Sequence, residues 1–373
     1  MERLLGIIEC NYTSVTANPL SAARPAASLP FHGRYRLVDF ALSNMTNAGV
    51  DTVGLIMPPE YRSIIDHVGA GKEWGLARKR GGLFPAPGSQ FGTARNGGRF
   101  LISDIMANKP LLTRNNYDYV VFSTANFVIN IDYRAMLEAH IASGADITML
   151  AQSVPQDRHD ADVVSLSVED GRVMGCTQGA VDGQVGFLDA FIISREVLFG
   201  LLDRYHNVGY LDLFEALADD FGRTNVRTYM FEGYAAPAFC LDSYFRVGMD
   251  LLDPAVVDEV FAPARPIKTK SHDSTPAKYE SGCSVSNALV SSSCKIYGQV
   301  ENSVLGRHVV VEPGASVKNC IIMQGVRVCA GAQLENAIID RNNTIAAETV
   351  MKGTEQDILY VAKSDDYRAG TDN

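Results

Sequence analysis

The chain has 373 residues, of which 46% are hydrophobic and 20% charged, and its formal net charge at pH 7 is −10. This composition fits a soluble protein long enough for two domains, and the acidic balance argues against a nucleic-acid-binding surface. No apolar run reaches the roughly 20 residues of a membrane-spanning helix, and the N-terminal apolar run ends too early for a signal peptide. Seven cysteines without a CxxC pair predict reduced, free thiols in a cytoplasm, and the lack of a long apolar run predicts no membrane partner.

Strand-like and helix-like segments alternate over the first roughly 250 residues, the pattern of a parallel sheet with crossover helices. Short apolar strands are predicted at residues 4–8, 53–57, 119–124 and 147–151, and helices at 39–47 and 133–142. His140 falls on the apolar face of the second helix, so we expect a packed helix residue rather than a metal ligand. These segments predict a Rossmann-like, doubly wound α/β domain.

The loop after the first predicted strand is unusual because it contains no glycine. Many nucleotide-binding proteins hold phosphates at such a strand–loop–helix junction, where glycines let the backbone approach the phosphates. Here not one glycine lies between Ile7 and Gly33. Either the chain binds a nucleotide in another way, or it has kept the scaffold without the chemistry.

The C-terminal part of the chain is repetitive. Residues 256–283 are rich in proline, serine and charge without a period, which predicts a linker. Three similar segments follow, beginning at Val300, Val317 and Leu334, and one asparagine shares the same phase in each: Asn302, Asn319 and Asn336. A spacing near 18 residues, with small or apolar residues about every sixth position, predicts hexapeptide repeats wound into a left-handed parallel β-helix.

We therefore expect an α/β domain at residues 1–255, the linker at 256–283, and the β-helix domain with a C-terminal tail at 284–373. So short a solenoid has to cover its open ends. We expect it to pack on the first domain and on another subunit.

One long stretch carries a resemblance to a known family. "LPFHGRYRLVDFALSNMTNAGVDTVGL" (residues 29–55) resembles the ADP-glucose pyrophosphorylase pattern, in which a proline–phenylalanine pair leads into G-K-Y-R-L-I-D-F-x-L-S-N. "YRSIIDHVGAGKEWGL" (61–76), "DSYFRVGMDLL" (242–252) and the repeats extend it over nearly the whole chain. The resemblance implies a nucleotidyltransferase domain and a reaction that joins glucose 1-phosphate to ATP, releasing pyrophosphate and ADP-glucose for glycogen synthesis. Catalysis of this kind depends on positioning, a metal ion and charge neutralisation.

The residues that the family uses on the nucleotide phosphates are replaced here. Its G-G-x-G-T-R-L loop aligns with residues 11–17, where all three glycines are lost and Thr16 takes the place of the arginine. Ala26 takes the place of the lysine in the family's R-A-K-P segment. Residues with a Cβ keep the backbone away from phosphates, and the lost arginine removes a permanent charge.

The implied metal and sugar-phosphate positions are replaced too. Asn126 and Pro237 stand where the family has two metal-holding aspartates, and asparagine brings an oxygen but no negative charge to Mg²⁺. The family's sugar-phosphate lysine is expected near residues 178–179, yet none of residues 163–184 is a lysine. Single losses of such groups cost roughly 3–4 kcal/mol each. We therefore expect no catalytic residue, no cofactor and no metal in this chain.

The family also contains degenerate subunits, of the GlgD type, that lack the catalytic residues and change the metabolite response of a catalytic partner. The resemblance implies such a regulatory subunit, in a heterotetramer whose catalytic partner uses Mg²⁺, with a homo-oligomer as the assembly of the chain alone. Arg24, Arg34 and Arg36 match basic positions of the family's effector site for sugar phosphates or nucleotides. Ion pairs across a domain or subunit contact are the alternative, because the neighbouring family lysine is Ala23 here.

Two other functions stay open: an active nucleotidyltransferase of altered mechanism, and a stand-alone sugar-phosphate sensor or interaction protein. Hexapeptide solenoids also build acyltransferases with a catalytic histidine, but His308 is the one histidine in the repeats and the coils are few. "GAGKEWG" (69–75) lacks the Ser or Thr of a phosphate loop, so we expect a plain loop. "DRHDAD" (157–162) is expected to be solvated charge rather than a metal site.

Overall fold

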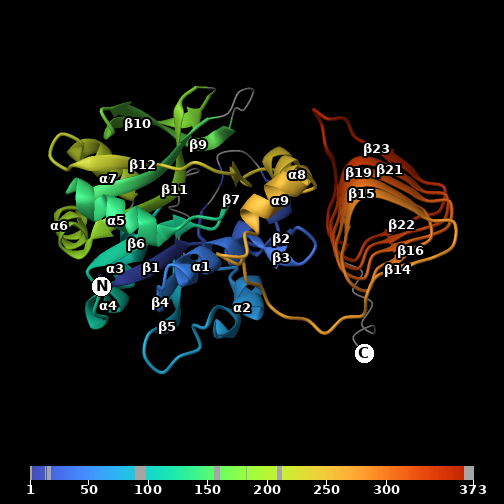
Figure 1. Ribbon diagram of the computed structural model, residues 1–373, viewed down its shortest axis with the longest axis horizontal. Coiled ribbons are helices and arrows are strands. Elements are labelled where there is room, and N and C mark those ends of the chain that lie inside the picture. The colour runs from blue at the N-terminus through green and yellow to red at the C-terminus, as the bar shows by residue number, and fades with distance from the viewer. Residues whose placement is uncertain are drawn as a thin grey trace. The chain divides into compact units, whose positions relative to one another are not determined.

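The computed structural model describes residues 2–12, 14, 18–88, 98–154, 160–181, 183–207 and 212–364. These residues form two compact units, each assembled from separate stretches of the chain (Figure 1). The first unit takes in the described residues of Met1–Leu29, Leu37–Cys240 and Glu259–Lys270, and the second those of Pro30–Arg36, Leu241–Asp258 and Ser271–Asn373. A short N-terminal segment therefore belongs with the C-terminal repeats.

A nine-stranded sheet forms the centre of the first unit. In spatial order its strands are β5 (Gly82–Pro87), β4 (Thr52–Met57), β1 (Leu4–Glu9), β6 (Tyr119–Thr124), β11 (Val185–Ser194), β8 (Ile147–Ser153), β12 (Val226–Met230), β10 (Arg172–Ala180) and β9 (Asp160–Glu169). The four strands that the sequence predicts are β1, β4, β6 and β8, and they are confirmed.

The sheet is mixed, which corrects the prediction of a parallel sheet. β5, β4, β1 and β6 pair in parallel, whereas β11 runs antiparallel to both of its neighbours, β6 and β8. The β9–β10 pair departs from a parallel sheet as well. β9 and β10 are joined by a tight turn at Asp170 and Gly171 and pair antiparallel, and β11 pairs antiparallel with β9. Short turns join antiparallel strands, whereas parallel strands need a longer crossover.

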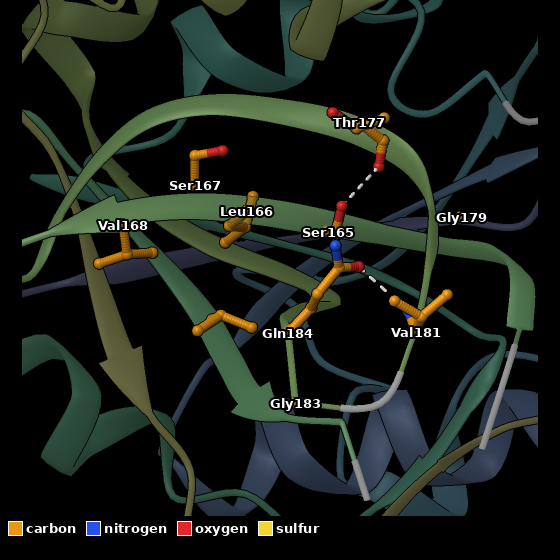
Figure 2. A pocket seen from close by; sticks show the side chains of 10 residues that line it. Ser165, Leu166, Ser167, Val168, Thr177, Gly179, Val181, Gly183 and Gln184 are labelled. Atoms are coloured by element: carbon orange, nitrogen blue, oxygen red, sulfur yellow. Dashed lines mark hydrogen bonds between the residues drawn. The ribbon is translucent and has the colours of Figure 1, made fainter. Parts of the chain in front are cut away.

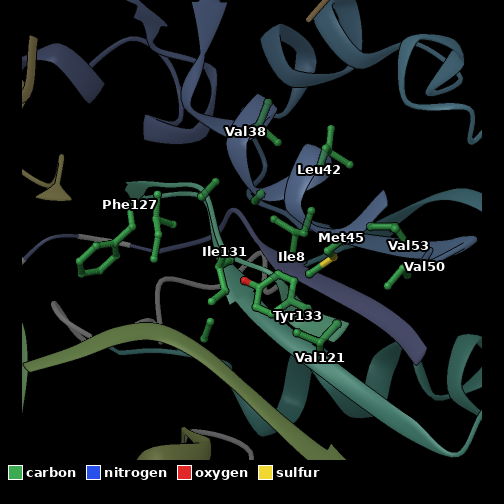
Figure 3. Packing of buried hydrophobic residues seen from close by; sticks show 14 of the residues in the cluster. Ile8, Val38, Leu42, Met45, Val50, Val53, Val121, Phe127, Ile131 and Tyr133 are labelled. Carbon is green, nitrogen blue, oxygen red and sulfur yellow. The ribbon is translucent and has the colours of Figure 1, made fainter. Parts of the chain in front are cut away.

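Helices pack on both faces of this sheet and form two hydrophobic cores. One core includes residues of α1 (Leu37–Asn47), α2 (Arg62–Val68) and α5 (Tyr133–Ser143), and the other those of α3 (Ile102–Ala107), α4 (Lys109–Arg114), α6 (Arg195–Tyr205) and α7 (Leu213–Asp220). Along β1, Leu4 and Ile8 face the first core, and Leu5 and Ile7 face the second. Figure 3 shows Ile8 among residues of α1 and α5. The predicted helices at 39–47 and 133–142 are α1 and α5, which are confirmed.

His140, the cysteines and the lengths of the helices bear on three further predictions. His140 is buried, and its Nδ1 lies 2.7 Å from Thr148 Oγ1, so it is a packed helix residue as predicted. All seven cysteines are free thiols, of which Cys10, Cys294 and Cys320 are buried. Within the described part of the chain, no helix is both long enough and apolar enough to cross a membrane.

Buried polar residues on α1 hold the segments around that helix in place. Asn44 Nδ2 donates to the Ile129 carbonyl at 3.0 Å, and Asn44 Oδ1 accepts from the Ile131 backbone N–H at 3.3 Å. Ser43 Oγ accepts from the backbone N–H of Lys268 at 2.9 Å and from the indole N–H of Trp74 at 3.2 Å. Ser43 and Asn44, the polar pair within residues 29–55, therefore have a structural role.

The C-terminal repeats form two parallel sheets in the second unit. One sheet contains β14 (Lys278–Tyr279), β16 (Lys295–Ile296), β18 (Val310–Val311), β20 (Arg327–Val328) and β22 (Thr344–Ile345). The other contains β15 (Ser284–Val290), β17 (Gln299–Leu305), β19 (Ser316–Ile322), β21 (Gln333–Ile339) and β23 (Val350–Lys352), with β24 (Leu359–Val361) paired to β21. Because the strands of the two sheets alternate along the chain, each coil supplies one strand to each sheet. The hand of the coils stays a prediction.

A ladder of asparagines joins successive coils in the phase that the sequence predicts. The side-chain amides of Asn287, Asn302 and Asn319 each donate to the next asparagine Oδ1, and Asn336 donates to the Gly353 carbonyl. The last three steps each span 17 residues. Asn302, Asn319 and Asn336 have φ of 45°, 48° and 49°, in the left-handed region that asparagine tolerates better than most residues.

Elements outside the repeats also belong to the second unit. A hairpin of β2 (Pro30–Phe31) and β3 (Tyr35–Arg36) contacts helix α8 (Leu241–Asp250), where the Tyr244 hydroxyl donates to the Pro30 carbonyl and the Tyr244 ring lies 5.8 Å from that of Phe31. Helix α9 (Pro254–Val260), whose last two residues belong to the first unit, overlaps the start of residues 256–283, the range for which the sequence predicts a linker, and strand β14 lies within that range. The domain boundaries themselves stay a prediction.

Replacing Asn319 by alanine is expected to lower the free energy of unfolding by about 2 kcal/mol, because two ladder hydrogen bonds are lost and a Cβ-bearing residue without a polar side chain is left at positive φ. Asn319→Gly loses the same bonds but suits the backbone, so it is expected to cost less. Urea unfolding followed by circular dichroism measures both values. Equal losses would show that the backbone conformation contributes nothing at this position.

Candidate functional site

The loop after β1 begins at the carboxyl ends of the parallel strands, the edge at which open α/β sheets bind ligands. The structure describes Asn11, Tyr12 and Ser14 of this loop, whereas Thr16, the replacement of the family's arginine, lies outside the described residues. All three described side chains hydrogen-bond to carboxylates of this chain. The loop is therefore engaged with the protein's own acidic residues.

Asp162 on β9 holds the loop through two hydroxyls. Its Oδ1 accepts from the Tyr12 hydroxyl at 2.5 Å, and its Oδ2 accepts from the Ser14 hydroxyl at 2.7 Å. Burial raises the pKa of the Tyr12 phenol, which keeps it neutral and able to donate. Asp162 is fully buried, so the prediction of solvated charge at residues 157–162 is wrong for this residue. Residues 157–159 lie outside the described residues.

Arg99 forms the centre of the same cluster. Its side chain is 2% exposed, and its Nε donates to Asp189 Oδ1 at 2.6 Å, while its Nη2 donates to the Asp162 carbonyl. Thr124 Oγ1 donates to Asp189 Oδ2 at 3.1 Å, and the Arg99 backbone N–H donates to Asp212 Oδ2 at 3.1 Å. Burial alone would lower the pKa of the guanidinium, but the adjacent Asp189 carboxylate raises it, so Arg99 stays charged.

Aromatic rings fill the space beside this ion pair. The Arg99 guanidinium lies 5.0 Å from the centre of the Tyr12 ring and 5.7 Å from that of Phe239. The Phe239 ring lies 5.1 Å from Tyr12 and 5.4 Å from Phe127. A phosphate placed here would have to displace these rings and would meet the carboxylates of Asp162 and Asp189. The cluster Tyr12–Arg99–Asp162–Asp189, called the plug below, therefore fills the space beside the described part of this loop.

Glu9, at the end of β1, is a second buried acidic residue that holds the loop. The Asn11 backbone N–H donates to Glu9 Oε1 at 2.8 Å, and Asn11 Nδ2 donates to Asp104 Oδ2 at 3.1 Å. Burial and the nearby Asp104 carboxylate raise the pKa of Glu9 to about 8. Glu9 therefore carries a proton at neutral pH.

The two positions at which the resemblance implies metal ligands lie side by side. Asn126 precedes β7 (Phe127–Ile129), which pairs with β13 (Ala235–Pro237) so that Phe127 lies opposite Pro237, and the Ala238 N–H donates to the Asn126 carbonyl at 2.8 Å. Asn126 is 3% exposed and brings no negative charge, while the side chain of Pro237 has no donor atom for a metal. These residues do not fit a Mg²⁺ site. Across the described residues, no group of three or more His, Cys, Asp or Glu side chains is arranged to hold a metal ion.

The predicted effector residues divide between the two units. Arg24 is buried and Ala26 begins the short helix η2 (Ala26–Ser28), both in the first unit. Arg34 and Arg36 lie on the β2–β3 hairpin of the second unit. That all three arginines converge on one anion stays a prediction.

The hairpin also brings in an arginine that the sequence reasoning missed. Gly33 at its tip has φ of +73°, and a Cβ there would overlap Ser291 Oγ and lie 3.5 Å from the Leu305 carbonyl. Arg34 therefore lies close to Arg307, where burial and the charge of Arg34 together lower the pKa of the Arg307 guanidinium. Arg307 lies 17 residues before Gln324, at the equivalent position of the repeat. This spacing predicts that Arg307 belongs to a coil, but it does not indicate that the hairpin lies beside it.

A surface cavity of about 440 Å³ lies between β9, β10 and the start of β11 (Figure 2). Gly179, in the range where the family's sugar-phosphate lysine is expected, lines it together with Ser165, Thr177, Val181 and Gln184. Ser165 Oγ donates to the Thr177 carbonyl at 3.2 Å, and the Val181 N–H donates to Gln184 Oε1 at 3.1 Å. None of its described lining residues is charged, so the cavity offers a phosphate no cation.

Comparisons with known proteins agree with both parts of the architecture. The family model "Nucleotidyl transferase" matches residues 17–162, and "GlmU-like, C-terminal hexapeptide" matches residues 272–358. The chain is 33% identical to the glycogen biosynthesis protein GlgD of Bacillus subtilis over 97% of this chain and 96% of the relative. It is 34% identical to GlgD of Geobacillus stearothermophilus over 84% and 83%, and 29% identical to the glucose-1-phosphate adenylyltransferase of Corynebacterium jeikeium over 92% of both chains.

Arg99→Met is expected to lower the free energy of unfolding by about 3–5 kcal/mol, because it leaves the Asp189 carboxylate buried without its partner. Adding Asp189→Asn removes that stranded charge, so the double variant should be more stable than the sum of the two single effects predicts. Urea unfolding of the four proteins gives the coupling energy. Additive losses would contradict the role of this pair as the centre of the plug.

Glu9→Gln is expected to change how stability depends on pH. The pKa of Glu9 is raised from 4.5 to about 8 in the folded chain. Between these two pH values the folded wild type keeps a proton that the unfolded chain has already lost. The free energy of unfolding of the wild type therefore falls as pH rises through this range. The amide cannot titrate, so the variant should gain on the wild type by up to about 1.4 kcal/mol per pH unit. Unfolding at pH 5 and 8.5 measures this gain, with the exposed Glu138→Gln as control. A difference independent of pH would refute the raised pKa.

Proposed function

The chain belongs to the family of GlgD glycogen biosynthesis proteins, and on this premise we propose that it is a non-catalytic regulatory subunit of bacterial ADP-glucose pyrophosphorylase. That enzyme converts ATP and glucose 1-phosphate to ADP-glucose and pyrophosphate in glycogen biosynthesis. In this proposal the chain modulates a catalytic partner subunit and does little or no chemistry alone.

The observation that carries the proposal is the plug at the end of β1. A nucleoside triphosphate bound there would have to displace the Tyr12 ring and approach the buried carboxylates of Asp162 and Asp189. It would also compete with Asp189 for Arg99, and separating a buried ion pair is costly. The lack of a carboxylate at Asn126 and Pro237 supports the same conclusion, and Mg²⁺ chemistry is assigned to the partner.

The proposed assembly is a cytoplasmic heterotetramer of this chain with the catalytic subunit. Free thiols in place of disulfides support a reducing compartment. The two parallel sheets and the hexapeptide match support a left-handed parallel β-helix as the fold of the repeats. The solenoid supplies one of the surfaces for contact between subunits.

The proposed effector is a sugar-phosphate or nucleotide anion bound by Arg24, Arg34 and Arg36. Support comes from the hairpin, where Arg34 lies beside Arg307 and the two positive charges repel each other. An anion between them would offset that repulsion, and guanidinium groups bind phosphate with paired hydrogen bonds.

Steady-state kinetics test the proposed function. Formation of ADP-glucose is measured with ATP, glucose 1-phosphate and Mg²⁺ for this chain alone, for a catalytic glucose-1-phosphate adenylyltransferase alone, and for the two after co-expression. We expect no turnover by this chain, co-purification of the two, and activation constants that differ between the complex and the catalytic subunit. Robust turnover by this chain alone would overturn the proposal, and absence of a complex would favour a stand-alone sensor.

Single Arg→Ala replacements at Arg24, Arg34, Arg36 and Arg307 test the effector site. Each is expected to raise the activation constant of the complex for an anionic effector at least about tenfold, which corresponds to roughly 1.4 kcal/mol per lost contact, while the complex stays assembled. Arg327→Ala is the matched control, since this solenoid arginine is paired with Glu312 on the surface. Dissociation of the complex with unchanged activation constants would show that the arginines are structural.

A further inference from the structure

A loop of the first unit concentrates positive charge on an otherwise acidic chain. The loop, residues 71–82, connects α2 to β5 through the short helix η3 (Lys72–Trp74). Lys72, Arg78, Lys79 and Arg80 are all exposed, and Glu73 is the one acid among these residues. The chain as a whole has a net charge of −10, so the loop is a local reversal of sign. We call residues 71–82 the basic loop.

The basic loop is anchored through buried apolar side chains. Trp74 and Leu76 are each 2% exposed, and the Trp74 indole N–H donates to Ser43 Oγ on α1. The Leu76 N–H donates to the Gly71 carbonyl at 2.9 Å, and the Arg78 N–H donates to the Leu76 carbonyl at 2.9 Å. The buried side chains of Trp74 and Leu76 therefore hold the backbone that carries the positively charged residues.

Glycines at the two ends of the loop give it a defined path. Gly71 has φ of +75°, and a Cβ there would lie 2.8 Å from Leu76 Cβ. Gly82 has φ of +113°, and a Cβ there would lie 2.7 Å from the Leu76 carbonyl oxygen. The chain thus turns tightly around Leu76 and carries residues 78–80 outward. In Figure 1 the ribbon between η3 and β5 runs as an open loop beyond the neighbouring helices.

Among the residues that the structure describes, the cations of the basic loop form no ion pair. No carboxylate of the described residues forms an ion pair with Lys72, Arg78, Lys79 or Arg80. The Arg78 Nε donates to the Gly75 carbonyl at 2.5 Å, which orients the guanidinium without neutralising it. Four exposed cations on a structured loop are available to an external anion.

We propose that the basic loop is a docking site for an acidic protein surface on the catalytic partner subunit. The inference rests on the proposed function for the identity of that partner. Arginine side chains bind carboxylates with two parallel hydrogen bonds, and a cluster of unpaired cations accelerates encounter with a negative surface. The overall charge disfavours a nucleic acid as the occupant, and residues 77–81, "ARKRG", contain no large apolar side chain to enter a membrane.

Charge reversal of the loop tests this site. The variant Arg78→Glu, Lys79→Glu, Arg80→Glu is compared with Arg114→Glu, Arg204→Glu, Arg223→Glu, which changes the net charge equally at exposed positions elsewhere. Biolayer interferometry measures the association rate constant with the catalytic subunit at 50 and 300 mM NaCl. We expect the loop variant to associate at least about tenfold more slowly at 50 mM, the difference to shrink at 300 mM, and the control to lie within about threefold of wild type.

The outcomes separate the docking site from the proposed function. Unchanged association of the loop variant, or an equal loss in the control, would overturn the docking site and leave the regulatory subunit intact. Failure of the wild type to bind the catalytic subunit would overturn both. Wild-type binding to duplex DNA or to anionic vesicles that is lost in the loop variant, with subunit association kept, would reassign the loop and overturn the proposal. Circular dichroism confirms that each variant is folded.

Discussion

The buried guanidinium of Arg99 is the constraint on which the first unit depends, because a buried positive charge has to be neutralised by a neighbouring group. Asp189 neutralises it from β11, the Asp162 carbonyl accepts from it on β9, and the backbone of Arg99 is held by Asp212 at the start of α7. Tyr12 then joins the cluster from the loop after β1. Segments far apart in sequence thus meet beside the carboxyl end of β1, and their packing there follows from electrostatic compensation.

Much of the fold was predictable because its signals are local. Apolar runs and helix-closing glycines identified β1, β4, β6, β8, α1 and α5, and the phase of the repeated asparagines identified the stacking of the coils. Asn126 and Pro237, the two positions at which the family pattern implies metal ligands, lie near each other although they are far apart in sequence. Strand pairing holds residues at neighbouring strand ends close together, so a sequence pattern that identifies the strand ends also predicts which residues lie near one another.

The plug was not predictable, because its members are joined only by tertiary contacts. Nothing near Arg99 in sequence indicates that Asp189 lies opposite it, and a cluster of acids at residues 157–162 resembles a solvated turn until the burial of Asp162 is known. The antiparallel β11 was missed for a related reason: apolar periodicity reports which face a strand buries, not the direction in which it runs. The proximity of Arg34 to Arg307 likewise depends on the placement of the hairpin.

The asparagine ladder has a consequence for how the length of this protein can change. Every rung contributes one donor and one acceptor, and the asparagine position repeats after 15 residues at the first step and after 17 residues at the next two. Deleting or inserting 17 residues between Asn302 and Asn336 would leave the surviving rungs matched, whereas a change of one residue would put a different residue at positive φ and break two rungs at once. The length of the solenoid is therefore free to vary by whole coils, and the 15-residue first step shows that a coil two residues shorter still forms its rung.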